Sequence, residues 1–106
     1  MTAGPGLWDA VAAELETAWR DHRAIAQISS TYPQLSVADA YAIQQRVVAG
    51  RLAAGARIVG WKIGLTSKAM QAALSIDIPD SGVLLGSMVF ANGADIPAGR
   101  FIQPRV

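Results

Sequence analysis

Lys62 is the side chain of this sequence whose surroundings most need a chemical explanation. It stands in the run RIVGWKIG, residues 57–64, where its neighbours are apolar residues or glycines. A buried ammonium group without a partner costs several kcal/mol. Lys62 therefore either extends into solvent, as lysines of apolar strands often do, or meets a ligand or a counter-charge. Both interpretations are open from these residues alone.

Two glycines flank this lysine. If residues 57–64 form a strand, Gly60 and Gly64 lie on the same face as Lys62, together with Ile58. Glycine weakens a strand and often marks the close approach of a ligand or of another backbone. We therefore predict unfilled space beside the ammonium group, on the face of the strand that the two glycines share with Lys62.

Asp80 is the second polar side chain that could do chemistry. It stands in the segment IDIPDSG, residues 76–82. Aspartate after proline is common in turns, so its simplest interpretation is a turn residue. A role in catalysis or ligand binding is the alternative.

Other patterns of catalysis or cofactor binding are weak. Neither glycine signature of nucleotide-phosphate binding occurs in the sequence. His22 is the only histidine and has no second ligand at a metal-binding spacing, and no serine stands in a nucleophile elbow. The tryptophans at positions 8, 19 and 61 are better explained as core or interface anchors than as cofactor stacks.

Composition limits the classes of partner. The 106 residues are 52% hydrophobic and 16% charged, with a net charge of +1, which indicates one small globular domain. The nine lysines and arginines are spread singly, so we expect no nucleic-acid partner. No apolar run is long enough to span a membrane, and the acidic N-terminal stretch is not a signal peptide. The absence of cysteine excludes disulfides and thiolate metal sites, and we expect a cytoplasmic protein.

Helical spacing dominates the first half of the chain. Apolar residues from Leu7 to Trp19 predict an amphipathic helix that fades near residues 22–26. ISSTYPQ, residues 28–34, is typical of a loop. Ser36 and Asp39 then predict a capping box for a second helix ending near Gly55. The expected apolar face of that helix comprises Val37, Ala40, Tyr41, Val48 and Leu52.

The second half has strand periodicity. Residues 57–64 predict a strand, Thr66 or Ser67 caps a short helix, and VLLGSMVF, residues 83–90, predicts a second strand. Asn92-Gly93 suits a hairpin turn that would bring residues 94–106 back beside it. We therefore expect an α+β fold with residues 1–106 as a single unit, helical over 7–54 and β-containing over 56–106.

Several ordered motifs carry a family resemblance. GWKIGLTSKAMQ, IDIPDSGVLL, IP and FIQPR, preceded by SVADAYAIQQRVVAGRLAAGARIVG, resemble the N-terminal portion of the 2-keto-4-pentenoate hydratase family. This family, also called 2-hydroxypenta-2,4-dienoate hydratase, belongs to the fumarylacetoacetate hydrolase superfamily. The resemblance covers roughly residues 7–106 and implies an incomplete start of the mixed, β-rich superfamily fold.

The resemblance implies a metal-dependent lyase of aromatic-compound catabolism. Such a hydratase adds water to 2-hydroxypenta-2,4-dienoate, giving 4-hydroxy-2-oxopentanoate, with Mg²⁺ or Mn²⁺ as Lewis acid. Lys62 matches the family's active-site lysine and Asp80 the aspartate of its PD motif. Lys62 would hold the anionic end or enolate oxygen of the substrate, and Asp80 would pair with it and help to shuttle protons or orient water. Gly60 and Gly64 would form the substrate-binding floor for this small oxo acid.

The resemblance also implies what these residues lack. In the family a carboxylate-x-carboxylate metal motif follows QPR, whereas this sequence ends at Val106. We therefore expect no metal ligand among the 106 residues, no tight metal binding and no measurable turnover by them alone, and a solvated Lys62. The full-length family is expected to be homo-oligomeric and to associate with a pathway decarboxylase or aldolase.

Two alternatives stay open. The related 4-oxalocrotonate decarboxylase also stabilises an enolate on a metal, although Pro79-Asp80 favours the hydratase. The alternative from another class is a non-enzymatic helical interaction fragment, which would have no reason to keep both Lys62 and Asp80.

Overall fold

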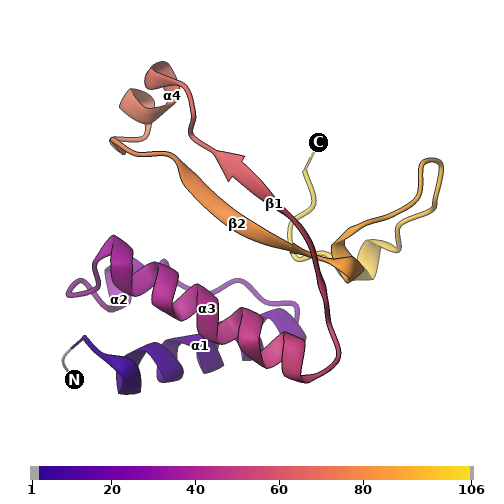
Figure 1. Cartoon of the computed structure of the whole chain (residues 1–106), viewed down its shortest axis with the longest axis horizontal. Coiled ribbons are helices and arrows are strands. Elements are labelled where there is room, and N and C mark those ends of the chain that lie inside the picture. Colours follow the sequence, from indigo (N-terminus) through magenta and orange to yellow (C-terminus); the bar gives the residue numbers. More distant parts are fainter. Residues whose placement is uncertain (1–2, 106) are drawn as a thin grey trace.

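The computed structural model describes residues 3–105 and contains helices and one two-stranded antiparallel sheet. The elements, in chain order, are α1 (Pro5–Arg20), α2 (Ile28–Thr31), α3 (Val37–Ala53), β1 (Ile58–Gly64), α4 (Lys68–Ala73), β2 (Asp80–Leu85) and two 3₁₀ turns, η1 (Gly86–Met88) and η2 (Ala98–Arg100). Helices α1 and α3 lie side by side, and the β1–β2 hairpin crosses above them with α4 at its far end (Figure 1). The expected combination of helices and sheet is confirmed at this level.

The hydrophobic core lies between α1 and α3. Leu7, Val11 and Ala12 of α1 are buried against Ile43 of α3. The helical spacing predicted for the first helix is confirmed, except that Trp19 is 48% exposed.

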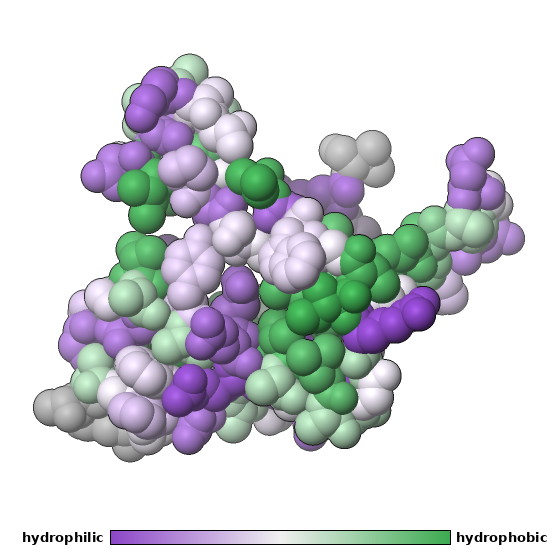
Figure 2. Space-filling model, viewed as in Figure 1, coloured by the Kyte–Doolittle hydropathy of each residue, from purple (hydrophilic) through white to green (hydrophobic). Residues whose placement is uncertain are grey.

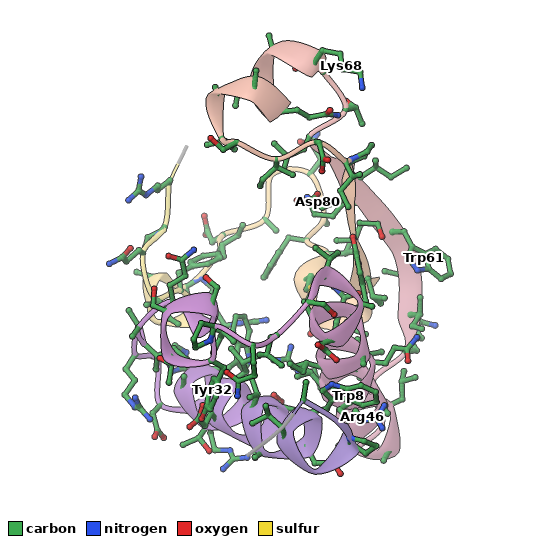
Figure 3. The ribbon with its side chains drawn as sticks, turned by 90° about the vertical axis from the view of Figure 1, so that its left-hand side faces the viewer. Trp8, Tyr32, Arg46, Trp61, Lys68 and Asp80 are labelled. Carbon is green, nitrogen blue, oxygen red and sulfur yellow. The ribbon has the colours of Figure 1, made fainter. Side chains whose placement is uncertain are left out.

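Two arginines of α3 connect this helix to α1 through contacts at the periphery of the pair. The Arg46 guanidinium lies 4.9 Å from the centre of the Trp8 ring, and its Nε lies 3.2 Å from Asp9 Oδ1 (Figure 3). Arg51 likewise lies 4.8 Å from the Trp19 ring centre and 3.0 Å from Glu16 Oε1. Each arginine therefore combines a cation–π contact with an ion pair to the same helix.

The predicted capping box at the start of α3 is confirmed. The Asp39 backbone N–H donates to Ser36 Oγ at 3.1 Å, and the Ser36 backbone N–H donates to Asp39 Oδ2 at 2.8 Å. Trp8 Nε1 also donates to Asp39 Oδ1, at 2.9 Å. The hydrogen bonds from Ser36, first its backbone and then its side chain, and the bond from Trp8 lower the pKa of Asp39.

The predicted apolar face of α3 is only partly correct. Ile43, which the prediction left out, is the buried residue of this helix, whereas Val37 is 56% and Leu52 39% exposed. Val37, Ala40 and Tyr41 instead line a cavity beneath the hairpin. The segment expected to be loop contains the short helix α2.

The hairpin pairs Lys62 with Gly82 and Gly64 with Asp80. A β-bulge lies between Ile58 and Gly60, because Ile58 pairs with Leu85 but Gly60 with Leu84. Successive residues of β2 face opposite ways, so the bulge removes Ile58 from the face of Lys62. The expectation that Ile58 shares that face is therefore wrong. Trp61, next to Lys62 in β1, points away from Asp80 (Figure 3).

The second strand differs from its predicted bounds of 83–90. It begins at Asp80 and ends at Leu85, the partner of the first residue of β1. The Gly86 N–H still donates to the Arg57 carbonyl at 3.0 Å, but the chain then makes the turn η1 and leaves the sheet. Gly93 has a φ of +81°, as a tight turn requires, but residues 94–105 form no returning strand. Pro97 lacks an N–H for a ladder, and the chain makes the turn η2 directly after it.

Residues 3–105 contain no helix with the length and apolar character needed to cross a membrane.

Candidate functional site

A cavity of about 430 Å³ lies between α3 and the end of the hairpin at which residues 65–79 connect β1 to β2. Its apolar wall is made by residues of α3, of the turn after β1 and of the loop before β2: Val37, Ala40, Leu65, Ile76, Ile78 and Pro79. Its polar side chains are Tyr41, Gln44, Lys62, Asp80 and Ser81. A largely apolar hollow with a few convergent polar groups is the usual form of a small-molecule site.

Lys62 and Asp80 meet across the two strands at this cavity. Lys62 Nζ lies 4.0 Å from Asp80 Oδ1, and the two side chains are 61% and 54% exposed. An ion pair this exposed contributes about 0–1 kcal/mol to stability. Stability therefore gives little reason for the pair, and both charged groups are accessible to a ligand.

Gly64 leaves room for this pair. A Cβ atom at this position would lie 2.5 Å from Asp80 Oδ1 and 3.2 Å from Lys62 Nζ, so a side chain would displace the carboxylate. The space predicted beside the ammonium group is thus occupied by Asp80. Gly60 differs, because a Cβ there would make only an ordinary contact with Leu84, at 3.9 Å. Neither glycine lines the cavity, and their part in substrate binding stays a prediction.

Helix α3 supplies two polar groups that the sequence did not indicate as functional. Tyr41 Oη accepts a hydrogen bond from the Ser81 backbone N–H at 3.1 Å, and Gln44 Nε2 donates to the Ser81 carbonyl at 3.4 Å. The helical spacing predicts Tyr41 only as a member of the apolar face of its helix. No local pattern relates either residue to a strand some 40 residues later, so only the tertiary structure reveals the contact.

The turn after β1 is held by a buried glutamine. Leu65 has a left-handed backbone, with φ of +53°, which costs free energy in a branched residue. Gln71 of α4 is 4% exposed, and its Nε2 donates to the Leu65 carbonyl at 2.7 Å. Ser67 caps α4 by accepting from the Met70 N–H, so one of the two predicted caps is confirmed. This turn fixes Leu65 in the cavity wall.

Metal-type ligands do not gather in the part of the chain that is described. Among residues 3–105, no three His, Cys, Asp or Glu side chains come together so as to hold a metal ion. At the cavity Asp80 is accompanied by a cation, Lys62, rather than by further carboxylates. These residues therefore do not fit a divalent-metal site.

No protein-family model matches the sequence. Curated relatives nevertheless match most of the chain. It is 47% identical over 96 residues to 2-oxo-hept-4-ene-1,7-dioate hydratase of Escherichia coli, which covers 91% of this chain and 36% of the relative. It is 46% identical over 101 residues to 2-keto-4-pentenoate hydratase 1 of Dechloromonas aromatica (strain RCB), covering 92% and 37%. A 2-hydroxypent-2,4-dienoate hydratase of Pseudomonas putida is 42% identical over 93 residues, covering 87% and 42%.

A solved structure supports the same relationship. The 4-oxalocrotonate decarboxylase of Pseudomonas putida G7, complexed with calcium and acetate, superimposes with a TM-score of 0.76 at 31% identity. That match covers 81% of this chain and 33% of the decarboxylase, and a complex with magnesium and adipate matches equally well. The chain spans little more than a third of the length of the first curated relatives. It is thus homologous, over almost all of its own length, to a part of the 2-keto-4-pentenoate hydratases.

Proposed function

We propose that this chain contributes the Lys62–Asp80 half of an active site that hydrates a short 2-hydroxy-dienoate of the 2-hydroxypenta-2,4-dienoate type. The observation that carries the proposal is the exposed pair of opposite charges, 4.0 Å apart, at the edge of a largely apolar cavity. Identities of 42–47% to hydratases of three named dienoate or keto acids support this substrate class.

The proposed reaction begins with ketonisation of the dienol. Its 2-hydroxyl loses a proton and C5 gains one, giving a 2-oxo-3-enoate. Water then adds at C4 while C3 gains a proton, so the product is a 4-hydroxy-2-oxo acid. Two carbons accept protons in turn, and a positioned acid–base group accelerates such steps by about 10²–10⁴-fold.

Each charged residue has a separate role in this proposal. The Lys62 ammonium donates hydrogen bonds to the carboxylate or enolate oxygen of the substrate, which favours the form with negative charge on oxygen. The Asp80 carboxylate accepts and returns the proton that moves between carbon and water. The apolar wall from Ile76, Ile78 and Leu65 would contact the hydrocarbon part of the substrate.

Mg²⁺ or Mn²⁺ belongs to this proposal through the resemblance and through the magnesium and calcium of the structural neighbours. Such an ion would act as Lewis acid on the 2-oxo group. Residues 3–105 do not form a site for it, so no step above is assigned to the ion.

The test is substitution of the two charged residues in the protein as its gene encodes it. We expect Lys62→Ala and Asp80→Asn each to lower kcat/KM for dienoate hydration by about 10²-fold or more. Lys68→Ala and Asp77→Asn are matched controls, because neither residue lines the cavity. Hydration is followed by the loss of dienoate absorbance. Activity near wild type in either cavity variant would remove that residue from the proposal.

4-Oxalocrotonate decarboxylation is the second candidate, favoured by the structural match to that decarboxylase. Measuring CO₂ release from 4-oxalocrotonate alongside hydration separates the two reactions. The proposal requires hydration to be the faster reaction, and the reverse order would favour the decarboxylase.

A further inference from the structure

Both backbone polar groups of Ser81 form hydrogen bonds with side chains of α3. Its N–H donates to Tyr41 Oη at 3.1 Å, and its C=O accepts from Gln44 Nε2 at 3.4 Å. Tyr41 and Gln44 are three residues apart, so they lie on one face of the helix. Because N–H and C=O groups of an antiparallel strand alternate in direction, those of Ser81 point away from β1 and would otherwise be open to water.

Asp80, the residue before Ser81, has little else to fix its position. It is the first residue of β2 and pairs with the last residue of β1, at the end of a two-stranded hairpin where the long connection of residues 65–79 joins the strands. Such hairpins are marginally stable alone, and their ends fray. The 4.0 Å contact with Lys62 is too long and too exposed to order the carboxylate.

We infer that Tyr41 and Gln44 are positioning residues, which hold the Ser81 peptide and thereby set the place of the Asp80 carboxylate relative to Lys62. Both side chains line the same cavity as the charged pair, so their hydrogen bonds to Ser81 lie at the site itself. Helix α3 would then be part of the active site without contributing a catalytic residue. The catalytic consequence of this inference depends on the proposed hydration.

The kinetic test is Tyr41→Phe, which removes the hydroxyl and keeps the ring in the cavity wall. We expect kcat for hydration to fall about tenfold with KM changed less than about twofold, because misplacement of a reacting group by a fraction of an ångström affects the chemical step more than binding. Tyr32→Phe is the matched control: its hydroxyl bonds Glu14, at 2.9 Å, and lies outside the cavity. It should leave kcat unchanged. Equal kcat in Tyr41→Phe and wild type, with Lys62→Ala inactive, overturns the inference while the proposed function stands.

A second measurement does not depend on activity. In this chain labelled for NMR, Tyr41→Phe should speed amide exchange of Ser81 about tenfold and shift the Asp80 carboxyl-carbon and Lys62 Nζ resonances, whereas Tyr32→Phe should change none of them. If the wild type hydrates no dienoate, the proposed function fails and these signals alone decide the positioning. Unchanged Asp80 and Lys62 signals contradict it. Gln44→Leu, which removes the second hydrogen bond, gives the same readouts and decides the matter if Tyr41→Phe does not fold.

Discussion

Gly64 shows how one missing side chain can determine a charged pair. The sequence placed it beside Lys62 and suggested an open floor, but the space that a Cβ would fill is occupied by the Asp80 carboxylate. The backbone of β1 can therefore approach the carboxylate closely only while residue 64 is glycine. Gly64 acts on the site through Asp80.

We predict that Gly64→Ala lowers hydration activity more than stability. The new methyl group would push Asp80 Oδ1 away from 2.5 Å, and both atoms it meets are ends of flexible side chains that can move. We expect kcat/KM to fall by about 10- to 100-fold, with a change of less than about 1 kcal/mol in the free energy of unfolding. Enzyme kinetics and urea denaturation measure the two quantities.

Gly86→Ala is the control for that substitution. A Cβ at Gly86 would contact Arg57 and Val59 at 3.7–3.8 Å, which is ordinary van der Waals distance, and it lies outside the cavity. It should leave kcat/KM close to wild type. Equal losses of activity in the two variants would mean that contact with the charged pair is not the cause.

At the scale of elements, the sequence predicted best what depends on near neighbours. The capping box of α3 and the cap of α4 involve residues three positions apart, and both are present. The face that α3 buries, the bulge in β1 and the end of β2 depend on partners distant in the chain, and there the predictions were wrong or incomplete. Tyr41 and Gln44 were missed for the same reason, because their partner Ser81 lies on another element.

The start of α3 should make stability depend on pH. The pKa of Asp39 is lowered in the folded chain, so its carboxylate stabilises the fold fully above the ordinary pKa of about 4 and stops doing so as pH falls through the lower, folded value. We predict that the wild type loses stability as pH is lowered from 5 towards 2, and that Asp39→Asn flattens this dependence. Urea denaturation followed by circular dichroism at each pH measures it.

Two further variants make that prediction specific. Asp77→Asn removes one carboxylate from the loop before β2 and corrects for the general effect of lost charge. Ser36→Ala removes the hydroxyl that donates to Asp39 Oδ2 at 2.9 Å but keeps the backbone donor, and should flatten the curve partly. If Asp39→Asn and Asp77→Asn give the same slope, the capping hydrogen bonds do not cause the pH dependence.

At the scale of the whole molecule, burial is uneven. The helix pair contains the main buried cluster, whereas the hairpin, apart from the buried Leu85, and the segment after it carry many exposed apolar side chains. Figure 2 shows hydrophobic side chains gathered where the start of β1 meets the segment after β2, where Val59 is 45% and Val89 60% exposed. The outer face of β1 is more open still, with Trp61 67% and Ile63 69% exposed. We therefore expect the hairpin to open at lower free energy than the helix pair.

Two isoleucines test this unevenness with the same substitution. Ile43 is 3% exposed and Ile63 69% exposed. Ile43→Ala should lower the free energy of unfolding by about 2–4 kcal/mol, because it leaves a cavity between α1 and α3. Ile63→Ala should change it by less than about 0.5 kcal/mol. Chemical denaturation measures both, and similar values would contradict the difference in burial between the two positions.

The hydrogen bonds from α3 to Ser81 also determine the edge at which the sheet can be extended. At this point of β2 the outward N–H and C=O groups are already bonded to Tyr41 and Gln44. A third strand therefore cannot continue the ladder past that edge unless the two bonds break. The outer edge of β1 carries no such cover from α3, so a strand joining this hairpin, from the same or from another polypeptide, would add beside β1. Helix α3, which contributes to the cavity, thereby blocks extension of the sheet beside β2 and leaves the outer edge of β1 for it.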